Sequence, residues 1–511
     1  MITRPEARTA APRHAQPQER QTRQVALTAL ALLVLIALAA ALRLAALDSH
    51  PGGLYEDEAA EGNDALRLLN EPGFHPAFFA DDGGREALFG YLVAGVFRTA
   101  GASVVALRVT AALLGVLAVA VTPLLLRRFG RTATLAGTTW AAGSLWLIAV
   151  SRDGMRNVLV PLVGTLAMAA LLAWHDRPSP PSAALAGATC ALGLWTYQPL
   201  KLLPLLVLAW LLWIRHADKP RWRQLRHTAR WAIAAYALVA APIAAAAITD
   251  PATYFGRGAA VSAFHSGDDA ASLPMHVLRT LGMFGVTGDP NPRHDAASIA
   301  LLPPLIALLA ALGAWRAWRN RRDGGHALLL IAVPVFLLPP LLATEGSSPH
   351  FLRSLGLAPV AAGLVGLGVK EAIERGRNLQ GRQGALAAAT AATAALALMT
   401  ATGAHAYFSR TVSERYDAYA YDLVALADAA RQPGATVVLD EYRAYVVRFV
   451  DRDQLPRIVT PGATLDAPPG TPILARDRDD LRRTVGTAAA ERATVVARDP
   501  KGAPVVWQVT L

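Results

Sequence analysis

The chain has 511 residues, of which 53% are hydrophobic and only 17% are charged, and its mean hydropathy is +0.32. Soluble proteins carry about 25% charged residues, so this composition argues against a soluble multidomain enzyme, and the apolar content excludes a disordered chain. The single cysteine, Cys190, excludes an intrachain disulfide and a cysteine-based zinc site. The net charge of +11 must be located along the chain before it can be taken as a sign of nucleic-acid binding.

The first predicted element is a membrane anchor at 25–47, which is almost continuously apolar apart from Arg43. At about 1.5 Å per residue it can cross a hydrocarbon core of about 30 Å, and it is too long for the apolar part of a signal peptide. Hydropathy predicts further spans at 104–126, 132–150, 157–174, 183–198, 200–214, 231–248, 298–315, 326–343, 354–369 and 384–401. We therefore predict an all-α polytopic membrane protein with about eleven transmembrane helices.

The positive charge lies in alternate loops between these spans. The N-terminus (1–24) and the stretches 127–131, 215–230 and 316–322 are basic, whereas the loop 48–85 holds nine Asp or Glu residues against two Arg. Cytoplasmic loops carry the excess of Lys and Arg, so we predict a multi-pass protein of the plasma (inner) membrane with a cytoplasmic N-terminus. The net charge is then an orientation signal, and no nucleic-acid partner is expected.

One apolar segment, 87–100, is too short to cross the membrane unaided, since a helix of that length measures roughly 21 Å. We predict that it lies in the outer interface as a juxtamembrane helix. The composition changes in the tail, 403–511, where β-type runs such as 435–439 and 493–497 are separated by Pro and Gly turns. The predicted domains are a basic N-terminus (1–24), a transmembrane domain (25–402) whose first outer loop is 48–103, and a small extracytoplasmic α/β domain (403–511).

The first outer loop contains the most informative polar segment. As a helix, it places Asp57, Glu61 and Asp64 on one face and small or apolar residues on the opposite face. Acids in the first turn of a helix are favoured by its dipole, so one interpretation is a solvated, well-capped external helix. The other is a carboxylate held at the membrane surface, where it takes a proton from an acceptor hydroxyl or amine.

A second acidic position lies in the segment Ser151-Arg-Asp-Gly-Met-Arg-Asn157, at the outer end of the third span. Asp153 is thereby placed on the same side of the membrane as Asp57. Two carboxylates at one interface can share a proton, a metal or an acceptor. The alternative is a polar turn between two spans, in which Gly154 supplies the bend.

A set of arginines on the outer side forms a third feature, namely Arg85, Arg108 and Arg353. Arg108 is a turn inside an apolar span, where an isolated charge is functional by default, although snorkelling to the interface is the alternative. Guanidinium groups at this depth suit a lipid phosphate, because they bind its oxygens in a fork and stay charged. We predict that these arginines bind a donor phosphate.

Other outer-loop residues are candidates for acceptor binding or for a lid, namely Tyr55, Arg152 and His350. The long loop 249–297, which contains Gly288-Asp-Pro-Asn-Pro-Arg-His294, is a further lid or groove candidate, because it exceeds common connection lengths. The histidines are scattered, and a lone loop histidine is more often solvated than a ligand, so no metal ligand is assigned. The sequence also lacks a P-loop and a dinucleotide glycine fingerprint.

Together these residues resemble the polyprenyl-phosphate-dependent membrane glycosyltransferases of the GT-C fold, specifically family 39 and its relatives, a group that includes protein O-mannosyltransferases and lipid A aminoarabinose transferases. The resemblance rests on the pair Asp57-Glu58 after the first span, the juxtamembrane helix, Arg108 early in the second span, and Asp153 in the next outer loop. It covers about 50–370 in organisation. Many relatives have Lys-Pro-Pro-Leu or His-Pro-Pro-Leu where this chain has Arg-Glu-Ala-Leu at 85–88, a departure that bears on substrate subclass more than on fold.

The resemblance implies a sugar donor on a polyprenyl monophosphate and a protein, lipid or glycan acceptor, with transfer at the extracytoplasmic face. Asp57 would be the general base for direct displacement with inversion. Glu58 would orient the acceptor or support the fold, and Asp153 would hold the acceptor or assist Asp57. The three outer arginines would stabilise charge on the leaving phosphate. No nucleotide sugar and no obligatory metal are expected, although a divalent metal held by acids stays open.

Two other classes of protein fit parts of the pattern. A transporter or flippase of lipid-linked sugars would use the same carboxylates to carry protons, and a non-catalytic envelope assembly protein would use its outer domain for binding. The spans lack acids and the charge is concentrated on the outer face, which favours the enzyme over the transporter.

Overall fold

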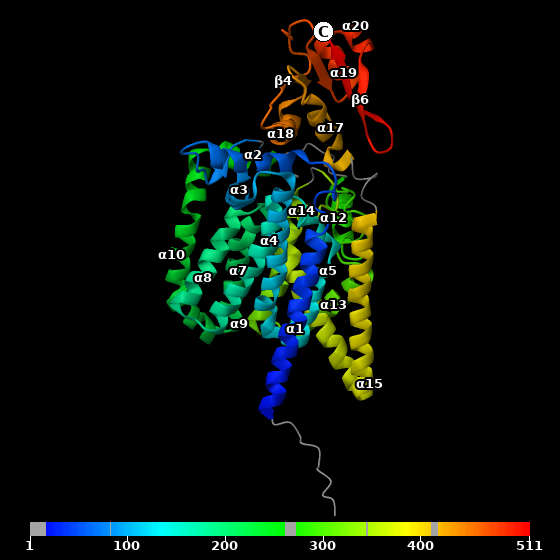
Figure 1. Cartoon of the computed structure of the whole chain (residues 1–511). Coiled ribbons are helices and arrows are strands. Elements are labelled where there is room, and N and C mark those ends of the chain that lie inside the picture. The colour runs from blue at the N-terminus through cyan, green and yellow to red at the C-terminus, as the bar shows by residue number, and fades with distance from the viewer. Residues whose placement is uncertain (1–16, 82, 261–271, 344–345, 410–416) are drawn as a thin grey trace, which may run out of the picture.

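The computed structural model of the chain describes residues 17–81, 83–260, 272–343, 346–409 and 417–511. The start of the basic N-terminus and part of the long loop 249–297 lie outside the described residues. Most of the described chain is helical, and its long helices run side by side in a bundle that carries a smaller domain on one end (Figure 1). We call this end of the bundle the domain end.

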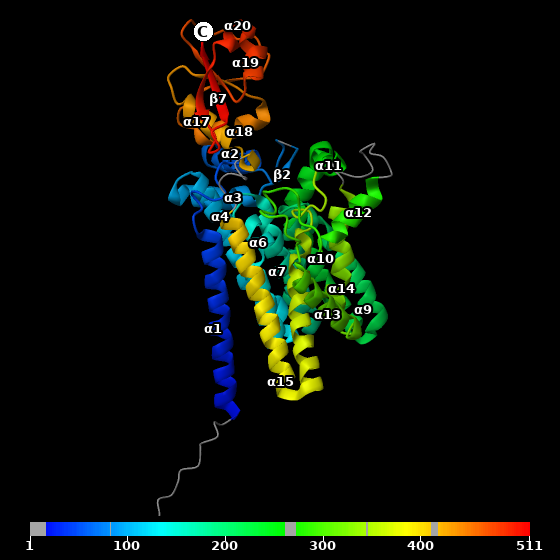
Figure 2. The ribbon, with the colours of Figure 1, turned by 90° about the vertical axis from the view of Figure 1, so that its right-hand side faces the viewer.

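Seven helical segments in the described part of the chain are long and apolar enough to cross a membrane. They contain α1 (Pro17–Leu44), α4 (Val104–Leu126), α7 (Leu159–Asp176), α9 (Leu203–Ala217), α10 (Lys219–Thr249), α14 (Gly324–Leu342) and α15 (Ala358–Ser409). α15 is kinked, because Gln380 and Gly381 leave the helical conformation and Gly381 adopts a φ of +59° that favours glycine. Its two arms form a hairpin (Figure 2), and each arm contains one of the last two predicted spans.

The remaining predicted spans form helices of fewer than 18 residues. The predicted span 132–150 is interrupted at Ser144, where the backbone is extended. The helices concerned are α5 (Arg131–Gly143), α6 (Leu145–Val150), α8 (Pro180–Leu192) and α13 (Pro304–Arg319).

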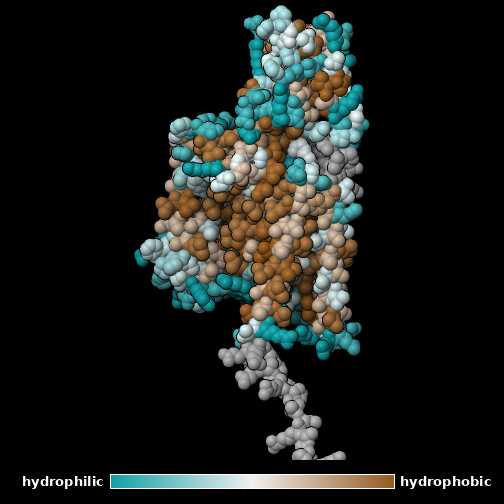
Figure 3. All heavy atoms as spheres, in the orientation of Figure 1, coloured by the Kyte–Doolittle hydropathy of each residue, from teal (hydrophilic) through white to brown (hydrophobic). Residues whose placement is uncertain are grey.

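On the face shown in Figure 3, an apolar band crosses the middle of the bundle, and largely hydrophilic surface covers both ends and the C-terminal domain. Large apolar side chains of the long helices are exposed, among them Ile233 and Leu238 of α10 at 68% and 77%. Contiguous exposure of this kind marks a surface that meets lipid. The chain is therefore a multi-pass membrane protein, as its hydropathy predicts.

Two short helices lie across the domain end of the bundle, α2 (Glu56–Asn70) and α3 (Leu88–Ala100) (Figures 1 and 2). The antiparallel strands β1 (Phe78–Phe79) and β2 (Arg85–Glu86) connect them. α3 buries Phe89, Val93 and Phe97 and exposes Tyr91 and Leu92, the amphipathic pattern of an interfacial helix. It corresponds to the predicted juxtamembrane segment 87–100.

The C-terminal domain is α/β, which confirms the predicted class. Its sheet has the strand order β4-β3-β5-β7-β6, in which β3 is parallel to β4 and β5, and β7 is antiparallel to β5 and β6. The strands are β3 (Thr436–Val438), β4 (Arg457–Val459), β5 (Pro472–Ala475), β6 (Thr494–Arg498) and β7 (Pro504–Thr510), and the helices are α17 (Tyr421–Ala430), α18 (Glu441–Val450), α19 (Arg478–Val485) and α20 (Thr487–Glu491). The predicted β-type runs form β3 and β6. The long loop contains α11 (Pro251–Ala260) and α12 (Ser272–Gly282).

Candidate active site

The first turn of α2 presents Asp57 to the C-terminal domain. Tyr442, in the first turn of α18, donates its hydroxyl to Asp57 Oδ1 at 2.8 Å and lies 3.0 Å from the hydroxyl of Tyr55. Glu56, Asp57 and Glu58 all lie at the N-terminus of α2, where the helix dipole favours negative charge. Asp57 is half-buried, so its carboxylate is held in place yet remains reachable.

The neighbouring Glu58 is fully buried and tightly bound. Its oxygens accept hydrogen bonds from Arg108 at 2.9 and 3.2 Å and from the backbone N–H of Gly154 at 3.1 Å. Arg108 also donates to the carbonyl of Gly53 at 2.7 Å. A Cβ at position 154 would lie 2.4 Å from Leu107 Cγ, so only glycine permits this close approach. Glu58 and Arg108 thus join α2, α4 and the loop after α6.

Asp153, in that loop, is buried and accepts a hydrogen bond from the hydroxyl of Tyr419 at 2.8 Å. Burial, helped by the charge of Glu58, raises the pKa of Asp153 to about 7, against the opposing effects of Tyr419 and of nearby arginines. The segment bearing Tyr419 fits here because position 53 is glycine, where a Cβ would lie 2.1 Å from the Tyr419 carbonyl oxygen. Asp153 therefore changes protonation near neutral pH.

Arg293 lies close enough to Asp57 and Asp153 for both carboxylates to act on its charge, and the sequence analysis assigned it no role. Its guanidinium carbon is 3.3 Å from the centroid of the Tyr55 ring. Burial lowers the pKa of Arg293, but the charges of Tyr55, Asp57 and Asp153 raise it overall, so the side chain stays positive. In the described part of the chain, no carboxylate accepts a hydrogen bond from Arg293, which leaves its fork of donors open to an anion. The only signal in the sequence was its place in the long loop.

The outer arginines named by the sequence analysis differ from Arg293 in their contacts. Arg85 is 1% exposed and donates to Asp64 Oδ2 at 3.0 and 2.8 Å, while Arg108 is held by Glu58 as described above. Burial raises the pKa of Asp64 to about 6 although Arg85 opposes the shift. Arg353 is half-buried and donates to the carbonyl of Ala343 at 3.0 Å. Arg85 and Arg108 are thus already engaged with acids.

More acids beneath α2 are paired in the same way. Arg156 bonds to Glu61 at 2.9 Å and to Glu86 at 3.1 Å, and Lys201 reaches the other oxygen of Glu86 at 2.9 Å. Glu61 and Glu86 are buried, and Arg156 and Lys201 are 14% and 19% exposed. Of the face predicted from Asp57, Glu61 and Asp64, only Asp57 has no cation bonded to it among the described residues.

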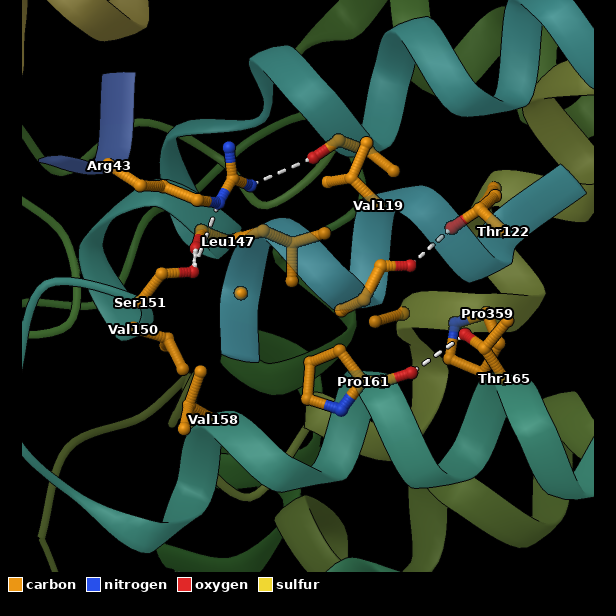
Figure 4. A pocket seen from close by; sticks show the side chains of 15 residues that line it. Arg43, Val119, Thr122, Leu147, Val150, Ser151, Val158, Pro161, Thr165 and Pro359 are labelled. Carbon is orange, nitrogen blue, oxygen red and sulfur yellow. Dashed lines mark hydrogen bonds between the residues drawn. The ribbon is translucent and has the colours of Figure 1, made fainter. Parts of the chain in front are cut away.

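Arg152, a candidate for acceptor binding or a lid in the sequence, lies at the end of a helix and caps it. It is fully buried and donates to backbone carbonyls at the C-terminal end of α1 and just beyond, those of residues 42, 43, 45, 46 and 50. Arg43 of α1 donates to the hydroxyl of Ser151 at 3.2 Å (Figure 4). It also donates to the carbonyls of Ala141 at 3.0 Å and Ala142 at 2.9 Å. Both guanidiniums satisfy carbonyls that a helix end leaves without partners.

His350 belongs to a compact group with Asp289 and His294. One ligand atom from each residue lies within 4.8 Å of the others, and His294 Nδ1 is 2.8 Å from Asp289 Oδ2. The backbone N–H of Phe351 donates to the same carboxylate oxygen at 2.8 Å. Burial lowers the pKa of both histidines, so they are neutral, as metal ligands must be. His350 Nδ1 is buried without a hydrogen-bond partner among the described residues.

Comparison with known proteins adds evidence on the fold. No family model and no curated protein matches the sequence. A structure of ArnT from Cupriavidus metallidurans bound to undecaprenyl phosphate is similar over 95% of this chain and 98% of that one, with a TM-score of 0.58 and 14% identity. The Archaeoglobus fulgidus oligosaccharyltransferase in complex with Zn and sulfate is similar over 84% of this chain but 62% of that one, with a TM-score of 0.56 and 15% identity. AglB from the same organism, in complex with an inhibitory peptide and a dolichol-phosphate, matches 95% of this chain and 74% of that one, with a TM-score of 0.56 and 12% identity.

The chain has the GT-C fold. At these identities the similarity establishes the fold, and the reaction has to be argued from the site. The domain end of this chain brings together Asp57, Asp153, Arg293 and Tyr55. Arg152 instead caps the end of α1. Tyr419 and Tyr442 complete the site from the C-terminal domain, and no pattern in the sequence singled them out.

Proposed function

We propose that the protein is a membrane glycosyltransferase that moves a sugar from a polyprenyl-phosphate donor to an acceptor at the domain end. The observation that carries this proposal is the meeting of Asp57, Asp153 and Arg293, two carboxylates bonded to neutral hydroxyls and a guanidinium with no carboxylate bonded to it. The solved structures support the donor class, since one contains undecaprenyl phosphate and another a dolichol-phosphate.

Asp57 is the general base of this reaction. As the acceptor oxygen attacks the anomeric carbon, its proton passes to Asp57, and the bond from that carbon to the phosphate oxygen breaks. The polyprenyl phosphate leaves with the bonding electrons, and a direct displacement inverts the anomeric centre. The half-buried carboxylate suits this role, because its hydrogen-bond partner Tyr442 is neutral and an acceptor can replace it.

Arg293 stabilises the charge that develops on the leaving phosphate, together with Arg353 on the adjoining loop. Burial lowers the pKa of His350, and the charges of Arg353 and Arg293 lower it further, so both guanidiniums lie near this histidine. A fixed donor aimed at developing charge contributes more in a site shielded from water than in solution. Arg85 and Arg108, which the sequence analysis names as phosphate ligands, position Asp64 and Glu58 instead. Glu58 thereby supports the fold.

Asp153 holds or orients the acceptor beside Asp57. With a pKa of about 7 it is present in both protonation states near neutral pH, so it can accept or donate a hydrogen bond to an acceptor hydroxyl. Tyr419 stabilises its charged form. This arrangement supports assistance to Asp57 rather than a second, independent base.

The domain end faces the extracytoplasmic side in this proposal. Arg128, at the end of α4, bonds to Asp176 and Asp323, so the ends of three helices meet on the side remote from the domain end. The basic loops beginning at Arg127 and Arg319 belong to that side. Because cytoplasmic loops carry the excess of Lys and Arg, the C-terminal domain and the active site lie outside.

A divalent metal fits the group of Asp289, His294 and His350. Two imidazoles and a carboxylate form a ligand set that suits Zn²⁺, and the buried Nδ1 of His350 lacks another partner among the described residues. When bound, the metal would supply a fixed positive charge that links the loop of Arg293 to the loop of Arg353. It has no part in proton transfer.

The test compares Asp57→Asn with Asp48→Asn, a matched change at an exposed acid in the same outer loop. Purified protein is incubated with labelled polyprenyl-phosphate sugars and a panel of protein, lipid and glycan acceptors. We expect Asp57→Asn to lose about 10²–10⁴-fold in transfer while it still binds the donor, because this is the usual contribution of a general base. Wild-type protein that moves the lipid across liposomes but never transfers sugar would contradict the proposal.

A further inference from the structure

The C-terminal domain contributes two tyrosines to the candidate active site. Tyr442, in α18, donates to Asp57 at 2.8 Å, and Tyr419, just before α17, donates to Asp153 at 2.8 Å. Both carboxylates assigned to the reaction are therefore bonded to phenol hydroxyls from a domain outside the membrane bundle. The two bonds differ in exposure, because Tyr419 is fully buried and Tyr442 is 36% exposed.

α18 is docked firmly against α2. The ring of Phe449 lies over Gly62, where a Cβ would be 2.5 Å from the ring, and it stacks on Phe97 with ring centroids 6.0 Å apart. Asn63 donates to the carbonyl of Tyr445 at 2.9 Å, and Arg452 donates to the carbonyl of Ala102 at 2.8 Å. Separating these surfaces would expose buried rings and break several bonds at once. α18 is thus a fixed wall of the site.

The hydroxyl of Tyr442 has the geometry of a bound substrate hydroxyl. A general base lies about 2.6–3.2 Å from the oxygen whose proton it removes, and Tyr442 stands within this range of Asp57. Burial, reinforced by the charge of Asp57, raises the pKa of Tyr442, so the phenol keeps its proton. Its ring is anchored at one end of α18 and partly exposed, so it can rotate away while the helix stays in place.

We propose that Tyr442 occupies the place of the acceptor hydroxyl, and that the acceptor displaces this side chain while α18 remains docked. The proposal rests on the assignment of Asp57 as the base. It also specifies the acceptor class as an alcohol. The Tyr442 oxygen is also 3.0 Å from the Tyr55 hydroxyl, and because a phenol has one hydrogen, a Tyr442 that donates to Asp57 has to accept from Tyr55. A hydroxyl group donates and accepts at once, whereas an alkylamine is an ammonium at neutral pH and only donates.

The test is Tyr442→Phe, which removes the hydroxyl and keeps the ring. Because the acceptor no longer competes with the Tyr442 hydroxyl, we expect its KM to fall about five- to tenfold, with kcat changed by less than about twofold. Tyr91→Phe is the matched control. Tyr91 lies on α3, and the substitution removes an exposed hydroxyl that donates to the Pro76 carbonyl at 3.1 Å. A lower kcat at constant KM, or no change in either constant, would overturn the proposal.

Two further measurements separate this proposal from the function on which it rests. Acceptors that differ only by a hydroxyl or an amino group should be used in favour of the hydroxyl, and equal use of both would contradict the assigned class. Hydrogen exchange of the α18 amides should be as slow with acceptor as without it, whereas faster exchange would mean that the domain itself moves. If transfer survives Asp57→Asn, the assignment of Asp57 as the general base fails. Unchanged Tyr442→Phe kinetics in an enzyme that needs Asp57 refute only the present proposal.

Discussion

Two groups of acids at the domain end are held in contrasting ways. Beneath α2, Glu58 is bonded to Arg108 and Asp64 to Arg85, and all four side chains are almost completely buried. At the surface shared with the C-terminal domain, Asp57 and Asp153 are bonded to tyrosine hydroxyls. The first group consists of closed ion pairs, whereas the second consists of carboxylates with neutral partners.

This difference distinguishes acids that support the fold from acids that can take part in the reaction, within one short segment. A buried ion pair resists any change of charge, because losing one partner leaves the other unpaired in a medium that solvates it poorly. A hydroxyl partner stabilises a carboxylate less and can be replaced by another hydroxyl, so Asp57 can exchange its partner for a substrate. Adjacent residues, Asp57 and Glu58, thus fall on opposite sides of this division.

The largest expected effect comes from breaking a closed pair. Glu58→Ala leaves the Arg108 guanidinium buried without its carboxylate, which costs about 3–5 kcal/mol of unfolding free energy. Asp57→Asn removes a half-buried charge bonded to a tyrosine, and we expect it to change stability by less than about 0.5 kcal/mol. Thermal unfolding in detergent micelles measures both. The double variant Glu58→Ala/Arg108→Met should recover part of the lost stability. Equal destabilisation by Glu58→Ala and Asp57→Asn would contradict the difference between closed ion pairs and hydroxyl-bonded acids.

The next effect concerns catalysis. Arg293→Ala should lower kcat/KM for the lipid-linked donor about 10²-fold, because it removes a charge aimed at the leaving phosphate, and it should change the unfolding temperature little. Arg67→Ala is the control, since Arg67 lies on α2 in partly exposed pairs with Glu71 and Asp81. If Arg293→Ala unfolds as readily as Glu58→Ala while transfer continues, Arg293 belongs with the structural pairs.

The architecture could be predicted from the sequence because hydropathy reports directly on contact with lipid. The points at which individual helices break or continue could not be predicted, since hydropathy does not report on local backbone geometry. Ser144 interrupts a continuous apolar run, and the arms of α15 continue as helix through polar residues between the two predicted spans. Gly381 was the available sign of the kink in α15, but an isolated glycine in a polar loop is common.

The site was predictable only as far as chain order allowed. Counting spans placed Asp57 and Asp153 at one end of the bundle, but their partners Tyr442 and Tyr419 are 385 and 266 residues away in sequence. An isolated charge inside a span indicates function only when no opposite charge pairs with it. Arg108 is paired with Glu58, which could not be foreseen because the two residues are far apart in the sequence. The same limit hid Arg293.

A smaller effect is expected from the histidine group. If Zn²⁺ binds there, a concentration one hundred times its Kd stabilises the folded chain by about 2.7 kcal/mol. Adding Zn²⁺ to metal-free protein should raise the unfolding temperature of the wild type and of a His75→Ala control, and have little effect on His350→Ala. Metal analysis of the purified protein should give one Zn²⁺ per chain, and its absence together with an unchanged unfolding temperature would remove the metal from the site.

The smallest effect is the contribution of Asp153 to the pH dependence of stability. Burial raises the pKa of Asp153 from its ordinary value of 3.8 to about 7 in the folded chain. Between these values the folded chain holds a proton that the unfolded chain has released, so stability is greatest below about pH 4 and falls as the pH rises through about 7. Asp153→Asn should flatten this part of the stability curve, whereas Asp48→Asn should leave it as in the wild type. An unchanged slope in Asp153→Asn would show that the protonation of Asp153 does not contribute to this pH dependence.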